Sequence, residues 1–370
     1  MNLKFWRKTP TNKNKTKKKK GAGREWFDAI LFAVIAATLI RSLFIEAYTI
    51  PTGSMEKTLL VGDFLFVSKM NYGARLPITP VSFPFAHHTM PILGTKAYWD
   101  GIQWKYHRLP GLSEIKRNDV VVFNYPMEAD SPYYRPVDKR ENYIKRCIGV
   151  AGDTLRIINA RVYINGQAAE VPQFGETNYY VKSDGTDFNP QTLQDMNIEV
   201  QRATEVDYYF NMTNAQAQTI KSWANVKSVK PVIRAINDYE PQIFPHNPEF
   251  KWNEDNFGPL ILPKKGWTVK LDHSTFPMYK RAISVYEGNK VEQKGNDILI
   301  NGIKADSYTF KLNYYWMMGD NRHNSLDSRY WGFVPEDHIV GKALFVWMSW
   351  DTNGTFLSKV RWNRIFGGIY

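Results

Sequence analysis

The chain has 370 residues, and its 48 Lys and Arg residues against 36 Asp and Glu residues give a formal net charge of +12. A hydrophobic fraction of 43% is enough to bury a core, which excludes wholesale disorder. A single cysteine excludes a disulfide framework and a cysteine-based zinc site. The length allows two domains, or one domain with a large insertion.

The positive charge is concentrated at the start of the chain. Residues 1–24 contain ten basic residues and no acidic residue, so 38 basic and 36 acidic residues remain, a net charge of only +2. Such a tail binds nucleic acid, targets a protein, or holds one side of a membrane span. The rest of the chain is nearly neutral, which argues against nucleic acid as a partner.

An apolar segment at residues 26–45 follows the tail. As a helix its 20 residues would be about 30 Å long, the thickness of a bilayer core. The basic tail then predicts a cytoplasmic N-terminus, with residues 46–370 on the other side of the membrane. Two alternatives stay open: a cleaved signal peptide, because the uncharged run at 29–40 is short, and a buried helix of a soluble protein.

The remaining sequence predicts a mainly β protein. Short apolar or alternating runs are separated by Gly, Asn, Asp and Pro residues. Residues 339–350 are too few to span a membrane and indicate a buried strand. The stretch 172–262 is richer in Asn, Gln, Asp and Tyr, and its 213–226 portion predicts a helix capped by Thr213.

We therefore predict a β-sheet catalytic domain that is interrupted by an α+β subdomain and anchored by one transmembrane helix. The expected divisions are a basic cytoplasmic tail (1–24), a transmembrane helix (25–46), the first part of the β domain (47–171), the inserted subdomain (172–262), the second part of the β domain (263–350) and a C-terminal segment (351–370).

Common catalytic and ligand-binding motifs are not found in the sequence. No serine lies in a G-x-S-x-G turn, no histidine pair has metal-binding spacing on a helix, and no glycine-rich phosphate loop is present. Each of the seven histidines is interpreted as a surface or loop residue, and Cys147 as a small core residue.

Three other segments contain residues suited to catalysis. Ser54 lies in a turn-prone stretch within YTIPTGSMEKTLLVGDFLFVSK (48–69). Lys145 has apolar neighbours in YIKRCIGVAGD (143–153), and desolvation there would lower its pKa and let it accept a serine proton. MMGDNRHNSLDSRYWGFVP (318–335) is dense in hydrogen-bonding groups. Taken singly, the three also fit a turn serine, a snorkelling lysine and a long capped loop.

Together the segments resemble type I signal peptidases (leader peptidases). That family has the blocks P-S-G-S-M-x-P-T-L, G-D-x-x-x-V-x-K, Y-I-K-R-x-I-G-x-P-G-D and G-D-N-R-x-N-S-x-D-S-R-x-W-G. This chain has PTGSMEKTL (51–59), GDFLFVSK (62–69), YIKRCIGVAGD (143–153) and GDNRHNSLDSRYWG (319–332), in the same order. The resemblance covers about 46–155 and 264–350, and leaves 172–262 unexplained.

The resemblance implies a Ser–Lys endopeptidase that removes signal peptides from secretory pre-proteins after small residues, at sites of the Ala-x-Ala type, without a metal or organic cofactor. Ser54 would be the nucleophile and Lys145 the general base. The Ser54 backbone N–H and the Thr52 hydroxyl would form the oxyanion hole. Two Pro residues usual in the family are replaced, by Lys57 and Ala151, and Thr52 replaces a usual Ser.

Further residues receive roles from the same resemblance. Ser325 would orient the Lys145 amine, and an Asp327–Arg329 pair would brace the surrounding loop. Substrate would bind as an added extended strand. Its small side chains would enter apolar pockets lined by Ile50, Pro51, Met55, Leu59, Tyr143 and Ile144.

The implied partners are secretory pre-proteins and the lipid bilayer, with no nucleic acid and no indication of oligomeric state. The implied location is the cytoplasmic (inner) membrane, crossed once, with the catalytic domain on the outer, periplasmic side. One alternative is an inactive membrane-anchored β-domain that serves as a binding module. Another is a self-cleaving repressor, which would need a DNA-binding helix-turn-helix where this chain has its apolar segment.

Overall fold

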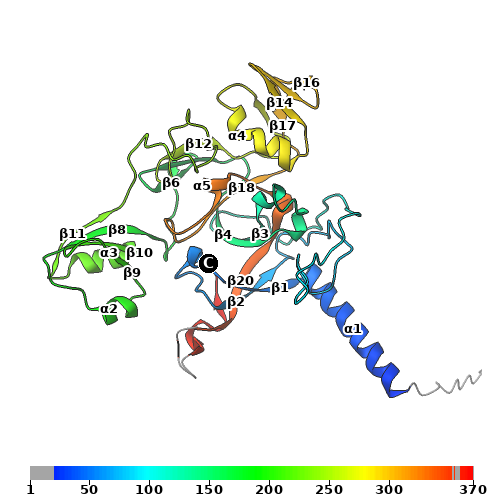
Figure 1. The fold of residues 1–370 in the computed structure, drawn as a ribbon, viewed down its shortest axis with the longest axis horizontal. Coiled ribbons are helices and arrows are strands. Elements are labelled where there is room, and N and C mark those ends of the chain that lie inside the picture. The colour runs from blue at the N-terminus through cyan, green and yellow to red at the C-terminus, as the bar shows by residue number, and fades with distance from the viewer. Residues whose placement is uncertain (1–20, 352–353, 355–358, 370) are drawn as a thin grey trace, which may run out of the picture.

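A computed structural model describes residues 21–351, 354 and 359–369 of the chain. Its centre is an eight-stranded sheet in the order β1-β2-β20-β3-β4-β18-β19, with β21 paired to β20 (Figure 1). The strand bounds are β1 (Ile45–Thr49), β2 (Asp63–Ser68), β3 (Val120–Asn124), β4 (Asn142–Gly149), β18 (Tyr314–Met318), β19 (Val334–Pro335), β20 (Ile339–Ser349) and β21 (Gly367–Gly368). Each neighbouring pair is antiparallel.

Both faces of this sheet are covered at its middle. All five residues of β3 are buried, because alternate side chains enter two different apolar clusters. Val120 and Val122 pack with Leu65, whereas Val121 and Phe123 pack with Cys147. The continuous apolar run of β3 therefore reflects burial on two faces, and the burial of Cys147 confirms the interpretation of that residue.

A single long helix, α1 (Ala22–Leu43), precedes the sheet and extends away from the rest of the molecule (Figure 1). None of its residues is buried, and the helix is long enough and apolar enough to cross a membrane. The helix ends at Leu43, slightly before the apolar segment does, because Ile45 already pairs with Ser68 of β2. Residues 1–20, which hold most of the basic tail, lie outside the described residues.

A second sheet, in the order β11-β8-β10-β9, lies at the far side of the molecule from α1 (Figure 1). One face packs against the helix α3 (Asn214–Lys221), whose Ala217 and Ile220 contact Val181 and Phe210. Its elements are β8 (Glu176–Ser183), α2 (Pro190–Asp195), β9 (Glu199–Arg202), β10 (Asp207–Thr213), α3 and β11 (Val226–Pro231). Thr213 caps α3, which confirms the predicted cap. The helix is shorter than predicted, because the chain turns at Trp223 and enters β11.

Three smaller sheets complete the described fold. They are β12-β5-β6-β7, β13-β17 and β14-β15-β16, and they share a large apolar cluster with Trp316 of β18. Their bounds are β5 (Thr154–Ile158), β6 (Arg161–Ile164), β7 (Gln167–Ala168), β12 (Phe257–Ile261), β13 (Thr268–Lys270), β14 (Val291–Lys294), β15 (Asp297–Ile300), β16 (Ile303–Lys304) and β17 (Ser307–Thr309), with the helix α4 (Phe276–Arg281) beside them. The mainly β class predicted from the sequence is thus confirmed.

Candidate active site

Ser54 lies in a short 3-10 turn, η1 (Gly53–Met55), just after β1. The turn is anchored by its neighbours, since Ile50 and Met55 are 3% and 1% exposed and pack in the core below the sheet. The Ile50 N–H donates to Asp63 O at 2.9 Å, and the Gly62 N–H donates to Ile50 O at 3.0 Å. These contacts fix the turn that carries Ser54, which is 9% exposed.

Lys145 reaches Ser54 from β4, in the middle of the central sheet. It pairs in register with Val121 of β3 and is 4% exposed. Its Nζ atom is hydrogen-bonded to Ser54 Oγ. Burial lowers the Lys145 pKa to about 8, and the carboxylates of Asp327 and Asp320 offset only part of that effect. About a tenth of the side chains would then be neutral at pH 7.

A buried ion pair holds the lysine strand against the loop that follows β18. Arg146, next to Lys145, donates from Nε and Nη2 to the two carboxylate oxygens of Asp320, at 2.8 and 2.7 Å. The Thr58 hydroxyl donates to the same carboxylate at 2.7 Å. Asp320 therefore connects the Lys145 strand to the segment after Ser54. Sequence reasoning assigned Asp320 only to a polar network and assigned no role to Arg146, although both lie in the matching blocks.

The loop after β18 also contacts the backbone of the serine turn. The Asn321 N–H donates to Ser54 O at 3.1 Å. A Cβ atom at Gly319 would lie closer than 3.0 Å to both Ser54 O and Ser325 Oγ. Gly319 thus lets its own backbone approach the Ser54 carbonyl and the Ser325 side chain more closely than a residue with a Cβ atom would permit.

The predicted supporting residues lie in the same loop, but only two of them pair with each other. Arg329 donates to the Asp327 carboxylate from Nε and Nη2, each at 2.9 Å, and both side chains are buried. Burial alone would raise the Asp327 pKa, but the Arg329 guanidinium outweighs it and the pKa is lowered. The Asp327 carboxylate also accepts the Gly319 N–H at 3.1 Å, which fixes the loop beside Ser54.

Ser325 is buried near the serine turn and is not hydrogen-bonded to Lys145. Among the described residues its hydroxyl has no partner of normal hydrogen-bond geometry. The Asp327 carboxylate is still near enough for this hydroxyl to contribute to the lowering of the Asp327 pKa. The predicted contact between Ser325 and the Lys145 amine is therefore not formed here, and its role stays a prediction.

An open groove of about 530 Å³ runs past Ser54 and Lys145. Thr52 and three of the six predicted substrate contacts, Pro51, Tyr143 and Ile144, line it. The other three, Ile50, Met55 and Leu59, are almost fully buried in the core and do not line the groove.

The second sheet is fastened directly to the serine turn. Lys57 Nζ lies 2.9 Å from Glu176 Oε1 at the start of β8, and it also donates to the Gln216 side chain of α3. The Glu176 N–H donates to Asp320 O at 2.9 Å. Lys57 stands where the family usually has Pro, and this substitution is the only signal in the sequence for the contact.

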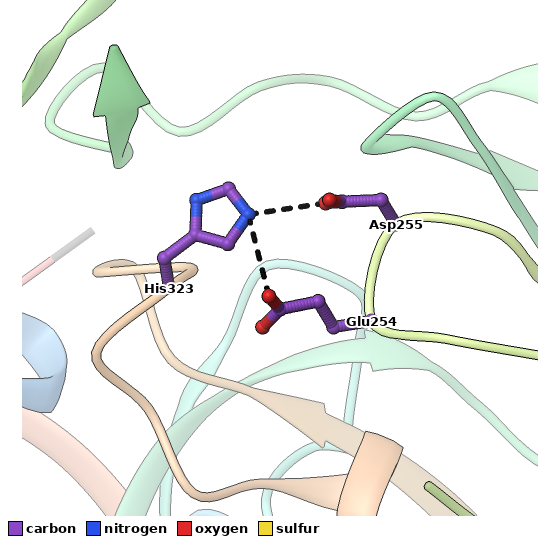
Figure 2. Close-up of side chains that lie close together, drawn as sticks. All are labelled: Glu254, Asp255 and His323. Atoms are coloured by element: carbon purple, nitrogen blue, oxygen red, sulfur yellow. Dashed lines mark hydrogen bonds and ion pairs between the residues drawn. The ribbon is translucent and has the colours of Figure 1, made fainter. Parts of the chain in front are cut away.

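His323 lies in the loop after β18. Its side chain faces Glu254 and Asp255 in the segment before β12 and so links the two segments (Figure 2). His323 Nδ1 accepts the Asn178 N–H at 3.1 Å, so the ring proton lies on Nε2. Nε2 in turn is 3.1 Å from Asp255 Oδ1 and 3.9 Å from Glu254 Oε1. Because a metal would need the lone pair of Nε2, this geometry fits a hydrogen-bonded link between chain segments better than a metal site.

His338 differs from the sequence interpretation of the histidines. It is 1% exposed, Nδ1 lies 2.6 Å from Asp337 Oδ1, and Nε2 is 2.7 Å from Arg140 Nη1. Its interpretation as a surface or loop residue is therefore wrong, because the neighbouring Asp337 and the distant Arg140 together satisfy both ring nitrogens in the interior. The network lies away from Ser54, and His338 does not line the groove.

Comparison with known proteins places these features in one class of peptidase. The chain belongs to the signal peptidase family, peptidase S26, which matches residues 23–229 and 304–350. Signal peptidase I of Buchnera aphidicola subsp. Acyrthosiphon pisum is 30% identical over 339 residues, covering 91% of this chain and 78% of the relative. Signal peptidase I of Pseudomonas aeruginosa is 26% identical, covering 89% and 72%. That of Rickettsia canadensis is 26% identical, covering 98% and 97%.

The family predicted from the four sequence blocks is therefore confirmed, and the chain is a serine peptidase. The apolar helix α1, with no buried residue, fits a membrane anchor in such a protein. The family match also extends over 23–229, which includes most of the second sheet.

Proposed function

We propose that this peptidase removes signal peptides from secretory pre-proteins with Ser54 as nucleophile and Lys145 as general base. The observation that carries the proposal is the hydrogen bond between Ser54 Oγ and the buried Lys145 Nζ. Burial lowers the Lys145 pKa to about 8, so a neutral amine is accessible near neutral pH. A neutral amine accepts the serine proton, whereas an ammonium cannot.

The reaction then proceeds in two balanced halves. The Ser54 proton moves to Lys145 Nζ while Oγ attacks the scissile carbonyl, and the resulting ammonium returns that proton to the leaving amine. This step breaks the peptide bond and leaves an acyl ester on Ser54. A water molecule then gives its proton to Lys145 and attacks the ester, after which the proton returns to Ser54 Oγ.

The oxyanion hole is proposed to consist of the Ser54 backbone N–H and the Thr52 hydroxyl. Both residues line the groove, and Thr52 has an extended backbone with φ −135° and ψ 155° just before the turn. A donor aimed at the developing negative charge contributes about 10²- to 10³-fold in rate. Loop bracing by Asp327 and Arg329 keeps the opposite wall of the site fixed.

The preference for small side chains is proposed to follow from how the groove is filled. Ile50, Met55 and Leu59 already occupy the space beneath it, which supports shallow rather than deep pockets. Pro51 and Ile144 provide apolar walls at the surface. An alanine side chain fits such a pocket, whereas a larger one would need to displace core atoms.

We place the protein in the cytoplasmic membrane, with α1 as its single span, its N-terminus in the cytoplasm and the catalytic body on the outer side. The exposed apolar surface of α1 and the ten basic residues before Glu25 support this topology. Nine residues separate Ile45 from Ser54, so an extended chain keeps Ser54 within about 30 Å of the end of the anchor. A signal peptide held in the same bilayer would meet Ser54 there.

The test uses the full chain in detergent and a pre-protein with an Ala-x-Ala site. Ser54→Ala and Lys145→Met should each lower kcat/KM at least about 10³-fold, by analogy with losses of single members of catalytic groups. Ser222→Ala and Lys280→Met, at exposed positions away from the groove, are the matched controls and should cleave normally. Near-normal cleavage by either site variant would refute the assignment, and no cleavage by the wild type would favour the inactive binding module.

Topology is tested separately in sealed inner-membrane vesicles. Protease added on the cytoplasmic face should digest only the N-terminal tail. Digestion of residues 46–370 from that face would reverse the proposed orientation.

A further inference from the structure

A second hollow of about 430 Å³ adjoins the groove that contains Ser54. The two hollows share Glu199 of β9 and Asn324 of the loop after β18. A chain leaving Ser54 past these two residues would therefore pass directly onto the second sheet. The resemblance left the role of this part of the chain unexplained.

The floor of the second hollow is the face of that sheet opposite α3, which we call the uncovered face because Glu199, Gln201 and Tyr209 are exposed on it. The loop after β18 covers it at Asn211, which is 6% exposed and donates its side-chain N–H to Asn321 Oδ1 at 3.1 Å. Asn211 pairs in register with Glu199 on one side and with Asn178 on the other, and Tyr209 pairs with Gln201. Because side chains alternate along a strand, these residues lie on one face, and all of them line the hollow. The opposite face carries Tyr208, Phe210 and Met212, which are buried in the cluster with α3.

The two hollows differ in character in a way that matches the two halves of a substrate. Pro51, Tyr143 and Ile144 make the wall of the first groove apolar, as the small apolar residues before a signal-peptide cleavage site require. The second hollow is lined largely by amide and hydroxyl groups. Such groups can hydrogen-bond an extended backbone of any sequence, which suits the mature protein beyond the cleaved bond.

Two acidic side chains lie close to one another near the junction of the hollows. Glu199 is exposed there, and Glu56, which lines the first groove, accepts the Asn197 side-chain N–H at 3.2 Å. Among the described residues that line the second hollow, Glu199 is the single charged one. The nearby Lys57 is already paired with Glu176 and does not line either hollow.

We infer that the uncovered face of the second sheet binds the first residues of the mature protein, and that Glu199 makes cleavage depend on their charge. This inference rests on the proposed function. Lysine or arginine just after the cleaved bond is favoured, and aspartate or glutamate is disfavoured. A single exposed charge pair changes binding by up to about fivefold, and attraction and repulsion together give a ratio of about five to ten.

The experiment compares three pre-proteins that differ only at the second to fourth residues after the cleaved bond, which are all Ser, all Lys or all Glu. We expect the wild-type enzyme to cleave the Lys form with about five- to tenfold higher kcat/KM than the Glu form. Glu199→Gln should bring this ratio close to one, and Glu199→Lys should invert it. Glu205→Gln, at an exposed position in the turn between β9 and β10 that lines neither hollow, should keep the wild-type ratio.

The outcomes separate this inference from the proposed function. A wild-type ratio near one, or a ratio unchanged by Glu199→Gln, would overturn the inference while cleavage of the Ser form upheld the function. If the Ser form is not cleaved at all, the function and the inference fall together. The ratio of kcat/KM for the Lys form to that for the Glu form should also shrink at 0.5 M salt, because screening weakens exposed charge pairs. A ratio that responds neither to salt nor to Glu199→Gln would overturn the inference and indicate recognition by shape alone.

Discussion

Lys57 Nζ lies 2.9 Å from Glu176 Oε1, and the two side chains are only 10% and 2% exposed. The pair joins the segment that follows the nucleophile to the first strand of the second sheet. Glu176 also donates its N–H to Asp320 O, next to the ion pair with Arg146. The second sheet is thus part of the framework that holds Ser54.

Removal of Lys57 alone should therefore cost both stability and rate. Burial raises the Glu176 pKa to about 7 even beside Lys57, so in Lys57→Met the buried carboxyl group should take up a proton. The lost hydrogen bonds and this protonation together should cost about 1–3 kcal/mol. We expect a lower midpoint of unfolding and a lower kcat, with KM changed less. The double variant Lys57→Met/Glu176→Gln should recover most of the stability, since no carboxyl group is then left without its partner.

The control is an exposed pair of the same type. Lys96 and Asp100 lie 3.0 Å apart but are 64% and 42% exposed. Lys96→Met should leave the midpoint of unfolding nearly unchanged, because solvent screens so exposed a pair. Equal losses at Lys57 and Lys96 would argue against a special contribution from the Lys57–Glu176 contact.

The lowered pKa of Lys145 predicts how cleavage depends on pH. Below about pH 8 the amine is mostly protonated and cannot accept the Ser54 proton. We expect kcat/KM to rise about tenfold per pH unit up to that point and then to level off. The measurement is kcat/KM for one pre-protein between pH 6 and pH 9.5, and a flat profile across this range would contradict the assignment of Lys145 as base.

The same burial makes Lys145 unfavourable for stability. Its pKa falls from 10.5 to about 8, so at pH 7 the folded state bears a cost of about 3 kcal/mol for the buried ammonium. The unfolded chain binds the proton more tightly between pH 8 and 10.5, and wild-type stability should rise with pH through that window. Lys145→Met should be inactive yet melt at a higher temperature than the wild type at pH 7.

That advantage should shrink by pH 10, where the wild-type lysine is neutral in the folded state. Thermal melting of the full chain in detergent at pH 7 and pH 10 checks both parts. A Lys145→Met variant that melts below the wild type at pH 7 would show that the contacts of the lysine outweigh its desolvation.

Gly319 should tolerate no added methyl group. A Cβ atom there would lie closer than 3.0 Å to the Ser54 carbonyl oxygen and to Ser325 Oγ. Gly319→Ala should displace the serine turn and lower kcat by about 100-fold, as a misplacement of about 1 Å can do. Gly23→Ala, on α1 where an added Cβ meets nothing within 4 Å, should cleave as the wild type does. Normal kcat in Gly319→Ala would show that the turn can shift without effect.

Much of the candidate site could be predicted from local sequence. Ser54 follows a short strand and precedes a turn at Gly62, and Lys145 stands among apolar residues of a strand, so both local structures follow from side-chain type and spacing. The four sequence blocks also identified the family, because all four occur in this chain in the family's order. The long apolar helix could be predicted as well, since a largely apolar stretch of 20 residues follows a basic tail.

Tertiary structure alone decided which side chains meet. Ile50, Met55 and Leu59 were expected at the substrate surface but are buried, because their strand and turn pack onto β2, β3 and β20. The contact between Lys57 and Glu176 joins residues 119 positions apart, and no local pattern records such a pairing. The uncovered face beside Glu199 likewise depends on how β8, β9 and β10 align.

The physical reason for this difference is that some properties depend on residues close in the sequence, whereas others depend on residues that only folding brings together. Helix formation, turn geometry and strand alternation depend on neighbours within a few residues, so the sequence by itself determined the long apolar helix and the β class, and it singled out Ser54 and Lys145 as candidates. Burial, and with it the lowered pKa of Lys145, depends on chain segments brought together from across the sequence. Only the folded sheet removes water from that amine and places it against Ser54.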